Sequence, residues 1–195
     1  MNIFVTGTDT GIGKTTVSAW ICAKTNATYW KPIQTGDDSD STTVSKFAKQ
    51  SVILPDAYHL KTPLSAYDAA HIENVNIDIN QIIKQCPQNR CIIEGAGGAL
   101  VPITTDTMMA DLIPLLRAKA LIVAKSQLGF LNHIFMTVEV LRERGIPIIG
   151  IVLNGETELI DTIERFSQCR VIAVLKSLND IHLLPIPDEI SEQLT

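Results

Sequence analysis

A glycine-containing segment near the N-terminus, NIFVTGTDTGIGKTT, constrains the fold of this chain more than any other feature. An apolar run over residues 2–6 leads into a turn, and a helical pattern opens at Lys14. In such a turn, backbone N–H groups point at phosphate oxygens, the lysine reaches the β- and γ-phosphates, and the hydroxyl of Thr15 can ligate Mg²⁺. Thr8 replaces the first glycine of the strict G-x-x-x-x-G-K-[ST] pattern, and Gly7 stands one position earlier. The segment predicts a phosphate-binding loop, with a plain strand-to-helix turn as the alternative.

Short apolar runs alternate with helical patterns along the rest of the chain. This alternation predicts an α/β fold: a single-domain, P-loop NTPase-like, mostly parallel sheet with helices on both faces. Hydrophobic residues make up 46% of the chain and charged residues only 19%, a balance that suits strands buried on both faces. The expected strands are 2–6, 28–33, 91–94, 121–124, 148–153 and 171–175, and the expected helices are 14–25, 40–50, 77–85, 110–116, 132–144 and 158–168.

The domain organisation is expected to be simple. A length of 195 residues fits one domain over residues 1–195, and no repeat or linker divides it. Residues 51–78 form the least regular part, which is either a short helix flanked by loops near the active site or a surface insertion. Ligands of parallel sheets bind beyond the carboxyl ends of the strands, so each chemical motif is expected to follow a strand.

The composition argues against several classes of partner. A formal net charge of -5 argues against a large nucleic-acid surface. The N-terminus does not read as a signal peptide, and no segment approaches the roughly 18 apolar residues that a membrane span needs. We therefore expect a cytoplasmic protein without nucleic-acid or membrane partners. Four scattered cysteines without C-x-x-C spacing predict free thiols and neither a zinc site nor disulfides: Cys22, Cys86, Cys91 and Cys169.

Two segments after the second expected strand carry charge. YWKPIQTG sets Lys31 before Pro32, which prevents helix continuation. On pattern alone a solvated lysine is the more common case, whereas a second cation beside a phosphate loop would stabilise a transferring phosphoryl group. DDSDSTT offers Ser39, Asp40 and Ser41 either as helix caps or as oxygen ligands for a divalent cation.

Three later segments also hold candidate residues. RCIIEGAGGALVPI ends an apolar run in Glu94, either a metal-assisting acid or an incidental glutamate beside a glycine turn. Thr15, Asp40 and Glu94 together would form an all-oxygen Mg²⁺ site completed by water and phosphate. In LGFLNHIFMTVEV, His133 has no partner at metal-ligand spacing and is expected to be a hydrogen-bonded structural residue. Asn154 in IVLNGE either reads a base edge or forms an Asn-Gly turn.

The chain resembles the dethiobiotin synthetase family in motifs that occur in the same order: GTDTGIGKT, KPIQTG, the Ser39–Asp40 pair, EGAGG, LGFLNH and the strand ending at Asn154. The resemblance covers residues 2–155. It implies a homodimeric enzyme that uses ATP as co-substrate and Mg²⁺ as cofactor. Such an enzyme joins CO₂ to 7,8-diaminopelargonate, closes the ureido ring of dethiobiotin, and releases ADP and phosphate.

The resemblance also implies roles for particular residues. Lys14 and Lys31 would be the catalytic lysines, and Thr15, Asp40 and Glu94 would ligate Mg²⁺. The nucleotide would be bound by Gly11, Ile12, Gly13, Lys14, Thr15, Thr16, Asp40, Glu94, Gly95, Ala96, Gly97, Asn154 and Gly155, with Asn154 reading adenine. The substrate would be bound by Thr35 and, at the dimer interface near its distant carboxylate, by Leu128, Gly129 and Asn132.

The chain departs from the usual pattern of this family at several positions. Gly11 stands where many relatives carry a larger, often acidic residue, and Gly155 replaces a common Asp. Ala173 and Lys176 stand where a Gly-x-[IL]-Pro motif beside the base is usual, although LPIP at 184–187 could supply a rigid turn. Nucleotide selectivity therefore does not follow from the sequence.

Two alternative functions remain open. A P-loop switch ATPase of the partitioning type usually carries an additional lysine early in the loop, where this chain has Thr8 and Asp9. Its basic membrane tail is also unlike the acidic DEISEQLT of this chain. The second alternative is a related amidoligase or kinase on another substrate, or a nucleotide-binding module without catalysis. The presence of both Lys14 and Lys31 argues against loss of catalysis.

Overall fold

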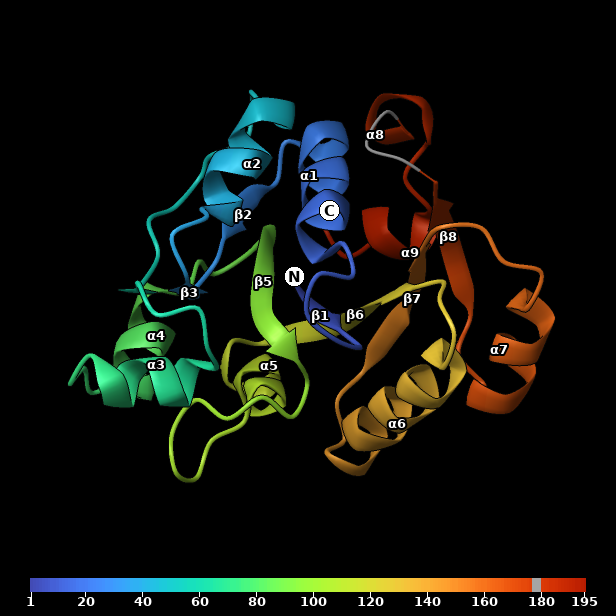
Figure 1. Ribbon diagram of the computed structural model, residues 1–195. Coiled ribbons are helices and arrows are strands. Elements are labelled where there is room, and N and C mark those ends of the chain that lie inside the picture. Colours follow the sequence, from blue (N-terminus) through green and yellow to red (C-terminus); the bar gives the residue numbers. More distant parts are fainter. Residues whose placement is uncertain (177–179) are drawn as a thin grey trace.

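The computed structural model describes residues 1–176 and 180–195, and its centre is a parallel sheet (Figure 1). The six strands run in the order β2-β5-β1-β6-β7-β8, and every neighbouring pair is parallel. The predicted mostly parallel sheet is therefore confirmed. The strands are β1 (Asn2–Gly7), β2 (Thr28–Trp30), β5 (Cys91–Gly98), β6 (Ala118–Lys125), β7 (Ile148–Asn154) and β8 (Val171–Leu175).

Helices cover both faces of this sheet, as predicted. Alternate residues of β1 enter different cores: Ile3 and Val5 pack in one, and Phe4 packs in the other. The first core is closed by α1 (Lys14–Thr25), α2 (Asp40–Phe47), α8 (Asp180–Leu183) and α9 (Asp188–Ser191). The second is closed by α3 (Ala66–Ile72), α4 (Ile79–Gln85), α5 (Leu112–Leu115), α6 (Phe130–Glu143) and α7 (Ile160–Ser167).

The strand expected over 28–33 is confirmed only over residues 28–30, because the chain leaves the main sheet after β2. Pro32 has no N–H to give to a sheet, and its carbonyl instead accepts hydrogen bonds from Ala57 N and Tyr58 N, each at 3.0 Å. The chain then forms β3 (Ile33–Thr35), which pairs with β4 (Tyr58–Leu60) in a separate parallel pair. This break leaves Lys31 between two strands that belong to different sheets.

Other differences lie mainly at the ends of elements. The helix expected over 110–116 is a 3₁₀ turn, Met109–Asp111, followed by the four-residue α5 that contains Pro114. β5 continues past Glu94 to Gly98, and β6 begins at Ala118. The irregular segment 51–78 contains β4 and the short α3, which favours the interpretation as a short helix flanked by loops.

Within residues 1–176 and 180–195 the cysteines belong to no disulfide and to no cluster of metal-binding side chains. All four are free thiols, and burial raises the pKa of Cys22 to about 12 and that of Cys86 to about 11. Thiols with such pKa values are poor nucleophiles at neutral pH. No helix within residues 1–176 and 180–195 combines the length and apolar character that crossing a membrane requires.

Candidate functional site

The predicted phosphate-binding loop lies between β1 and α1. Gly11 and Gly13 have φ values of 70° and 102°, in the left-handed region that glycine adopts without strain. At Gly13 a Cβ would also lie 2.3 Å from Asn154 Nδ2, so the position has no room for a side chain. Lys14 Nζ donates to the Asp9 carbonyl at 2.9 Å and thereby closes the loop. The turn and the N-terminus of α1 together form a concave surface for phosphate.

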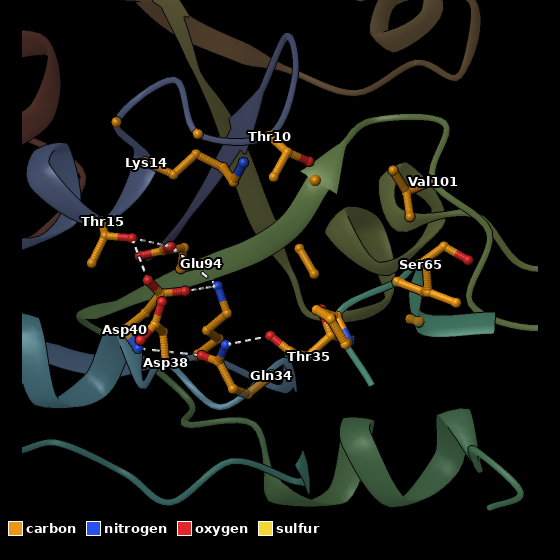
Figure 2. A pocket seen from close by; sticks show the side chains of 18 residues that line it. Thr10, Lys14, Thr15, Gln34, Thr35, Asp38, Asp40, Ser65, Glu94 and Val101 are labelled. Carbon is orange, nitrogen blue, oxygen red and sulfur yellow. Dashed lines mark hydrogen bonds and ion pairs between the residues drawn. The ribbon is translucent and has the colours of Figure 1, made fainter. Parts of the chain in front are cut away.

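A cavity of about 540 Å³ opens beside this loop at the carboxyl ends of the strands (Figure 2). It collects side chains from distant parts of the sequence, as the rule for parallel sheets predicts. Ten residues that the sequence singled out line it: Gly11, Gly13, Lys14, Thr15, Lys31, Thr35, Asp40, Glu94, Ala96 and Gly97.

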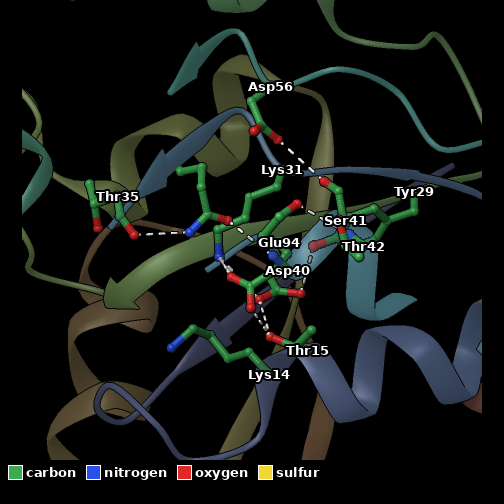
Figure 3. A network of polar contacts seen from close by, with 12 residues as sticks. Lys14, Thr15, Tyr29, Lys31, Thr35, Asp40, Ser41, Thr42, Asp56 and Glu94 are labelled. Carbon is green, nitrogen blue, oxygen red and sulfur yellow. Dashed lines mark hydrogen bonds and ion pairs between the residues drawn. The ribbon is translucent and has the colours of Figure 1, made fainter. Parts of the chain in front are cut away.

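An oxygen cluster with one central cation forms the wall of the cavity (Figure 3). The Thr15 hydroxyl lies 2.8 Å from Asp40 Oδ1 and 2.9 Å from Glu94 Oε1. Lys31 Nζ forms an ion pair with Asp40 and lies 3.2 Å from Glu94 Oε1. The three oxygen-bearing side chains meet, although 25 and 79 residues separate Thr15 from its two partners.

Lys31 is a buried residue, and its interpretation as a solvated surface lysine is wrong. Only 4% of Lys31 is exposed, and only 1% of Glu94. Burial acts to lower the pKa of Lys31, but the carboxylates of Glu94 and Asp40 outweigh burial and raise the pKa above its ordinary value. Lys31 therefore carries its positive charge throughout the neutral range.

Helix capping and carboxylate chemistry are divided between neighbouring residues of the DDSDSTT segment. The Ser39 hydroxyl caps α2 by accepting a hydrogen bond from Thr42 N at 3.2 Å. The Asp40 carboxylate is consequently left to meet Thr15 and Lys31. The capping role is therefore confirmed for Ser39, and the Asp40 carboxylate stays a candidate oxygen ligand for a divalent cation.

The oxygen cluster has the donor chemistry of a magnesium site. A threonine hydroxyl and two carboxylates are hard oxygen donors, which Mg²⁺ prefers. Within the described part of the chain no group of three or more His, Cys, Asp or Glu residues could hold a metal ion by itself. Thr15, Asp40 and Glu94 therefore suit an ion that keeps several waters and shares its remaining positions with phosphate oxygens.

Lys14 differs from Lys31 in its electrostatic surroundings. Burial lowers the pKa of Lys14 from its ordinary 10.5 to about 8; Glu94 opposes this shift, and the positive charge of Lys31 adds to it. At neutral pH the ammonium is charged but poorly compensated. A bound phosphate would supply the missing negative charge.

The affinity for MgADP should fall as pH rises above about 8. The phosphate oxygens favour the charged form of Lys14, so above this pKa binding of the nucleotide is coupled to protonation of Lys14. The dissociation constant should therefore rise about tenfold per pH unit. Calorimetric titrations between pH 7 and pH 9.5 test this expectation. In Lys14→Arg the guanidinium stays charged, so the slope should disappear; an unchanged slope in that variant would assign the effect to another group.

Tyr29 belongs to the site although the sequence did not point to it. Its hydroxyl donates to Glu94 Oε2 at 3.0 Å, and the residue is fully buried. Burial and then the charge of Glu94 raise the pKa of Tyr29 well above 10, so the hydroxyl stays protonated and remains a donor. The available signal was its position two residues before Lys31 in an apolar run, where strand alternation puts both side chains on one face.

Several predicted nucleotide residues lie beside the cavity without lining it. Asn154 Nδ2 donates to the Ile12 carbonyl at 2.9 Å, which ties the end of β7 to the phosphate-binding loop. Gly155 adopts φ 100° and donates its N–H to the Leu175 carbonyl at 2.7 Å. Gly95 packs against the Phe4 ring, where a Cβ would lie 2.8 Å from Cε1. Thr16 is the third residue of α1 and, like Ile12, is not among the lining residues.

The predicted substrate residues at the start of α6 do not reach the cavity within one chain. Leu128 is fully exposed, Gly129 precedes the helix as its N-cap, and Asn132 is exposed with its amide 3.9 Å from Met136 Sδ. They remain predictions. Near the expected base-contacting residues, Lys176 forms an ion pair with Glu156, and residues 177–179 lie outside the described part of the chain.

His133 does not meet its expectation. Its side chain forms no hydrogen bond with any residue in the described ranges 1–176 and 180–195, so the structural hydrogen bond that we expected is not found there. It instead lines a second cavity of about 430 Å³, which we call the α6 groove. The groove is mainly apolar, and its lining includes Leu100, Pro102, Met136 and Val140.

The chain is similar in sequence to a known domain family and to proteins named as ATP-dependent enzymes. Residues 1–182 match a sequence family described as an AAA domain. A protein of Paramagnetospirillum magneticum named ATP-dependent dethiobiotin synthetase BioD is 42% identical over 180 residues, 90% of this chain and 88% of the relative. A protein of the same name from Agrobacterium fabrum is 41% identical over 162 residues, with 81% and 76% covered.

Solved structures resemble this chain at the level of the fold. A ParA family ATPase from Chlorobium tepidum TLS has a TM-score of 0.60 at 11% identity, covering 98% of this chain and 88% of the other. The MinD cell division protein of Aquifex aeolicus has a TM-score of 0.59 at 14% identity, covering 93% and 84%. At such low identity these likenesses show the fold alone, and they confirm the predicted P-loop NTPase-like class.

Proposed function

This chain belongs to the ATP-dependent dethiobiotin synthetase family, and we propose that it joins CO₂ to 7,8-diaminopelargonate, closes the ureido ring of dethiobiotin, and releases ADP and phosphate. One observation in the structure supports this proposal independently of the names of the similar proteins. Lys31 is a buried, charged lysine held by Asp40 and Glu94 in the cavity that the phosphate-binding loop borders. A second cation stabilises charge on a phosphoryl group in transfer, a task that simple nucleotide binding does not include.

The reaction divides into a capture, a phosphorylation and a ring closure. One amine of the substrate attacks CO₂ and becomes a carbamate, whose negative charge resists attack and whose oxygen leaves poorly. Transfer of the γ-phosphoryl group of ATP to a carbamate oxygen breaks the bond to ADP and forms a mixed anhydride. The neighbouring amine then attacks the carbonyl carbon and expels phosphate. This last step is intramolecular and is favoured by proximity.

The two lysines stabilise charge at different places along this path. Lys14 stands within the phosphate-binding loop, so its ammonium binds the phosphate chain of the nucleotide. Lys31 approaches from the end of β2 and stabilises charge on the γ-phosphoryl group as it passes to the carbamate. Thr15, Asp40 and Glu94 would hold Mg²⁺, which neutralises charge on the β- and γ-phosphates when it is bound with ATP.

The remaining predicted residues complete the nucleotide and substrate sites in this proposal. Residues 11–16 and 94–97 would bind the phosphate chain, with Ile12, Thr16 and Gly95 behind the residues that line the cavity, and Thr35, which lines it, would contact the diamine. Asn154 gives one N–H to the phosphate-binding loop, and its amide retains an oxygen and a second N–H with which to read an adenine edge. Gly155 adjoins the base.

We further propose a homodimer in which a second copy covers the α6 groove. The groove shares Thr10, Ser65 and Val101 with the catalytic cavity, so a chain seated there borders the substrate. Leu128, Gly129 and Asn132, which do not reach their own cavity, would then act in the cavity of the partner copy.

Replacing Met136 by glutamate should convert such a dimer into monomers. Met136 is 49% exposed in the α6 groove, and a carboxylate at this position would lose its hydration when a second copy covers the groove. Light scattering coupled to size-exclusion chromatography gives the mass directly. Phe166→Glu is the matched control, because Phe166 is 68% exposed on α7 outside the groove. A dimeric Met136→Glu variant would argue that copies associate elsewhere.

Phosphate release by the purified protein tests the proposed function. The assay contains MgATP and bicarbonate, with and without 7,8-diaminopelargonate, and mass spectrometry detects dethiobiotin. Diamine-dependent release with formation of dethiobiotin is expected. Hydrolysis that ignores the diamine would favour a partitioning-type switch, and release that requires a different amine would favour a related amidoligase.

A further inference from the structure

The Tyr29 hydroxyl is buried beside a carboxylate that the proposed function assigns to the metal site. Tyr29 pairs with Ile92 in the ladder between β2 and β5, so Tyr29, Ile92 and Glu94 lie on the same face of the sheet. This face packs against α1, which carries Thr15. Tyr29 thus approaches Glu94 from the protein interior, whereas Thr15 and Lys31 approach it from the cavity (Figure 3).

The two oxygens of Glu94 have different partners. Oε2 accepts the hydrogen bond from Tyr29 at 3.0 Å, and this contact is buried. Oε1 accepts from Lys31 at 3.2 Å and lies 2.9 Å from the Thr15 hydroxyl. Only Oε1 therefore belongs to the oxygen cluster that includes Asp40.

The backbone and the burial of Tyr29 restrict the position of its hydroxyl. Tyr29 N donates to the Val52 carbonyl and Leu54 N donates to the Tyr29 carbonyl, each at 2.9 Å. On its other side β2 pairs with β5. The backbone is held from both sides and the side chain is packed in the core, so the hydroxyl does not withdraw from Glu94 without a rearrangement of the core.

We propose that Tyr29 is a positioning residue that makes Glu94 a one-oxygen ligand and thereby favours Mg²⁺ over Ca²⁺ in the proposed enzyme. Mg²⁺ demands near-octahedral geometry and is usually bound through single carboxylate oxygens. Ca²⁺ takes six to eight oxygens and often binds both oxygens of one carboxylate. With Oε2 held by Tyr29, the two-oxygen mode that suits Ca²⁺ is blocked. The inference rests on the proposed function only for the presence of a metal site at this cluster.

A purely structural explanation makes a different prediction. A buried phenol needs a hydrogen-bond partner, and Glu94 is within reach of it. If satisfying the phenol were its whole role, removal of the hydroxyl would change the stability of the fold and leave the preference between the two metals unaltered. Metal preference is therefore the property to measure.

The test is displacement of Mn²⁺ from the protein–ADP complex, followed by electron paramagnetic resonance. Mg²⁺ and Ca²⁺ compete separately in the wild type, in Tyr29→Phe and in Tyr29→Leu, neither of which has the hydroxyl. In both variants we expect weaker binding of Mg²⁺ and a shift of the Mg²⁺-to-Ca²⁺ preference toward Ca²⁺ of about tenfold, the scale of other losses of hydrogen bonds to metal ligands. Thermal unfolding identifies the variants that are folded.

Tyr58→Phe is the matched control, because Tyr58 also bonds a side-chain oxygen, Gln81 Oε1 at 3.1 Å, away from the cavity. Its metal preference should equal that of the wild type. Unchanged preference in the folded Tyr29 variants, with Mn²⁺ still bound, would overturn the inference alone. Failure of the wild type to bind Mn²⁺ with ADP would instead overturn the magnesium site of the proposed function, and this inference with it.

Discussion

Lys31→Met is expected to lower kcat for dethiobiotin formation about 10³-fold, because it removes the cation nearest the oxygen cluster at which the phosphoryl group is transferred. The loss should be mainly in kcat. The phosphate-binding loop and Lys14 remain in place, so the affinity for MgADP should change much less. Initial rates and calorimetry together measure both effects.

The same substitution should also destabilise the folded protein. Lys31 compensates the buried Glu94, and removing one partner of a buried ion pair leaves the other charge unpaired, at a cost of about 3 kcal/mol. Asp40 is partly exposed and adds less. Urea unfolding of Lys31→Met measures this loss, with the exposed Lys84→Met on α4 as control. A variant with wild-type kcat would refute the catalytic role of Lys31.

Lys31 also illustrates what the sequence could and could not predict. The order of apolar runs and helical patterns specifies a parallel sheet, and the position of Lys31 after a strand specifies the edge that it occupies. Its burial depends on Asp40 and Glu94, which are 9 and 63 residues away. No local pattern contains that information, so the sequence alone favours a solvated lysine where the structure has a buried one.

The break at Pro32 has a different physical origin. The apolar run over 28–33 has the composition of one strand, and composition does not record where backbone N–H groups are missing from a ladder. The proline itself was visible in the sequence. After the break, the chain forms β3, which pairs with β4. β4 lies in the segment with the least regular pattern, so the sequence does not reveal this pairing.

The residues at the start of α6 cannot be understood from one copy of the chain alone. The family resemblance predicts that Leu128, Gly129 and Asn132 bind substrate, and the fold exposes this region away from its own cavity. If two copies meet at the α6 groove, both observations agree. The association would then complete the substrate site of each copy. The Met136→Glu variant should accordingly be monomeric and should also bind substrate more weakly.

Lys14→Met should abolish tight nucleotide binding and, unlike Lys31→Met, stabilise the protein without nucleotide. Loss of a buried charge partner for phosphate weakens binding by about 10²–10³-fold. The effect on stability has the opposite sign because the pKa of Lys14 is lowered to about 8, so its charged form is unfavourable in the folded chain. A fall from 10.5 to about 8 corresponds to roughly 3 kcal/mol at pH 7, an upper limit to the gain.

The pH dependence of unfolding separates this explanation from improved packing of methionine. Between about pH 8 and 10.5 the unfolded wild type binds a proton at Lys14 that the folded chain does not, so its stability should gain a contribution that grows with pH. Lys14→Met should lack that contribution, and its advantage over the wild type should shrink across the same interval. Urea unfolding at pH 7 and pH 9.5 measures the difference. Two carboxylates stabilise the charged form of Lys31, whereas desolvation destabilises the charged form of Lys14. A change of stability in the same direction in both methionine variants would therefore contradict the electrostatic roles assigned to the two lysines.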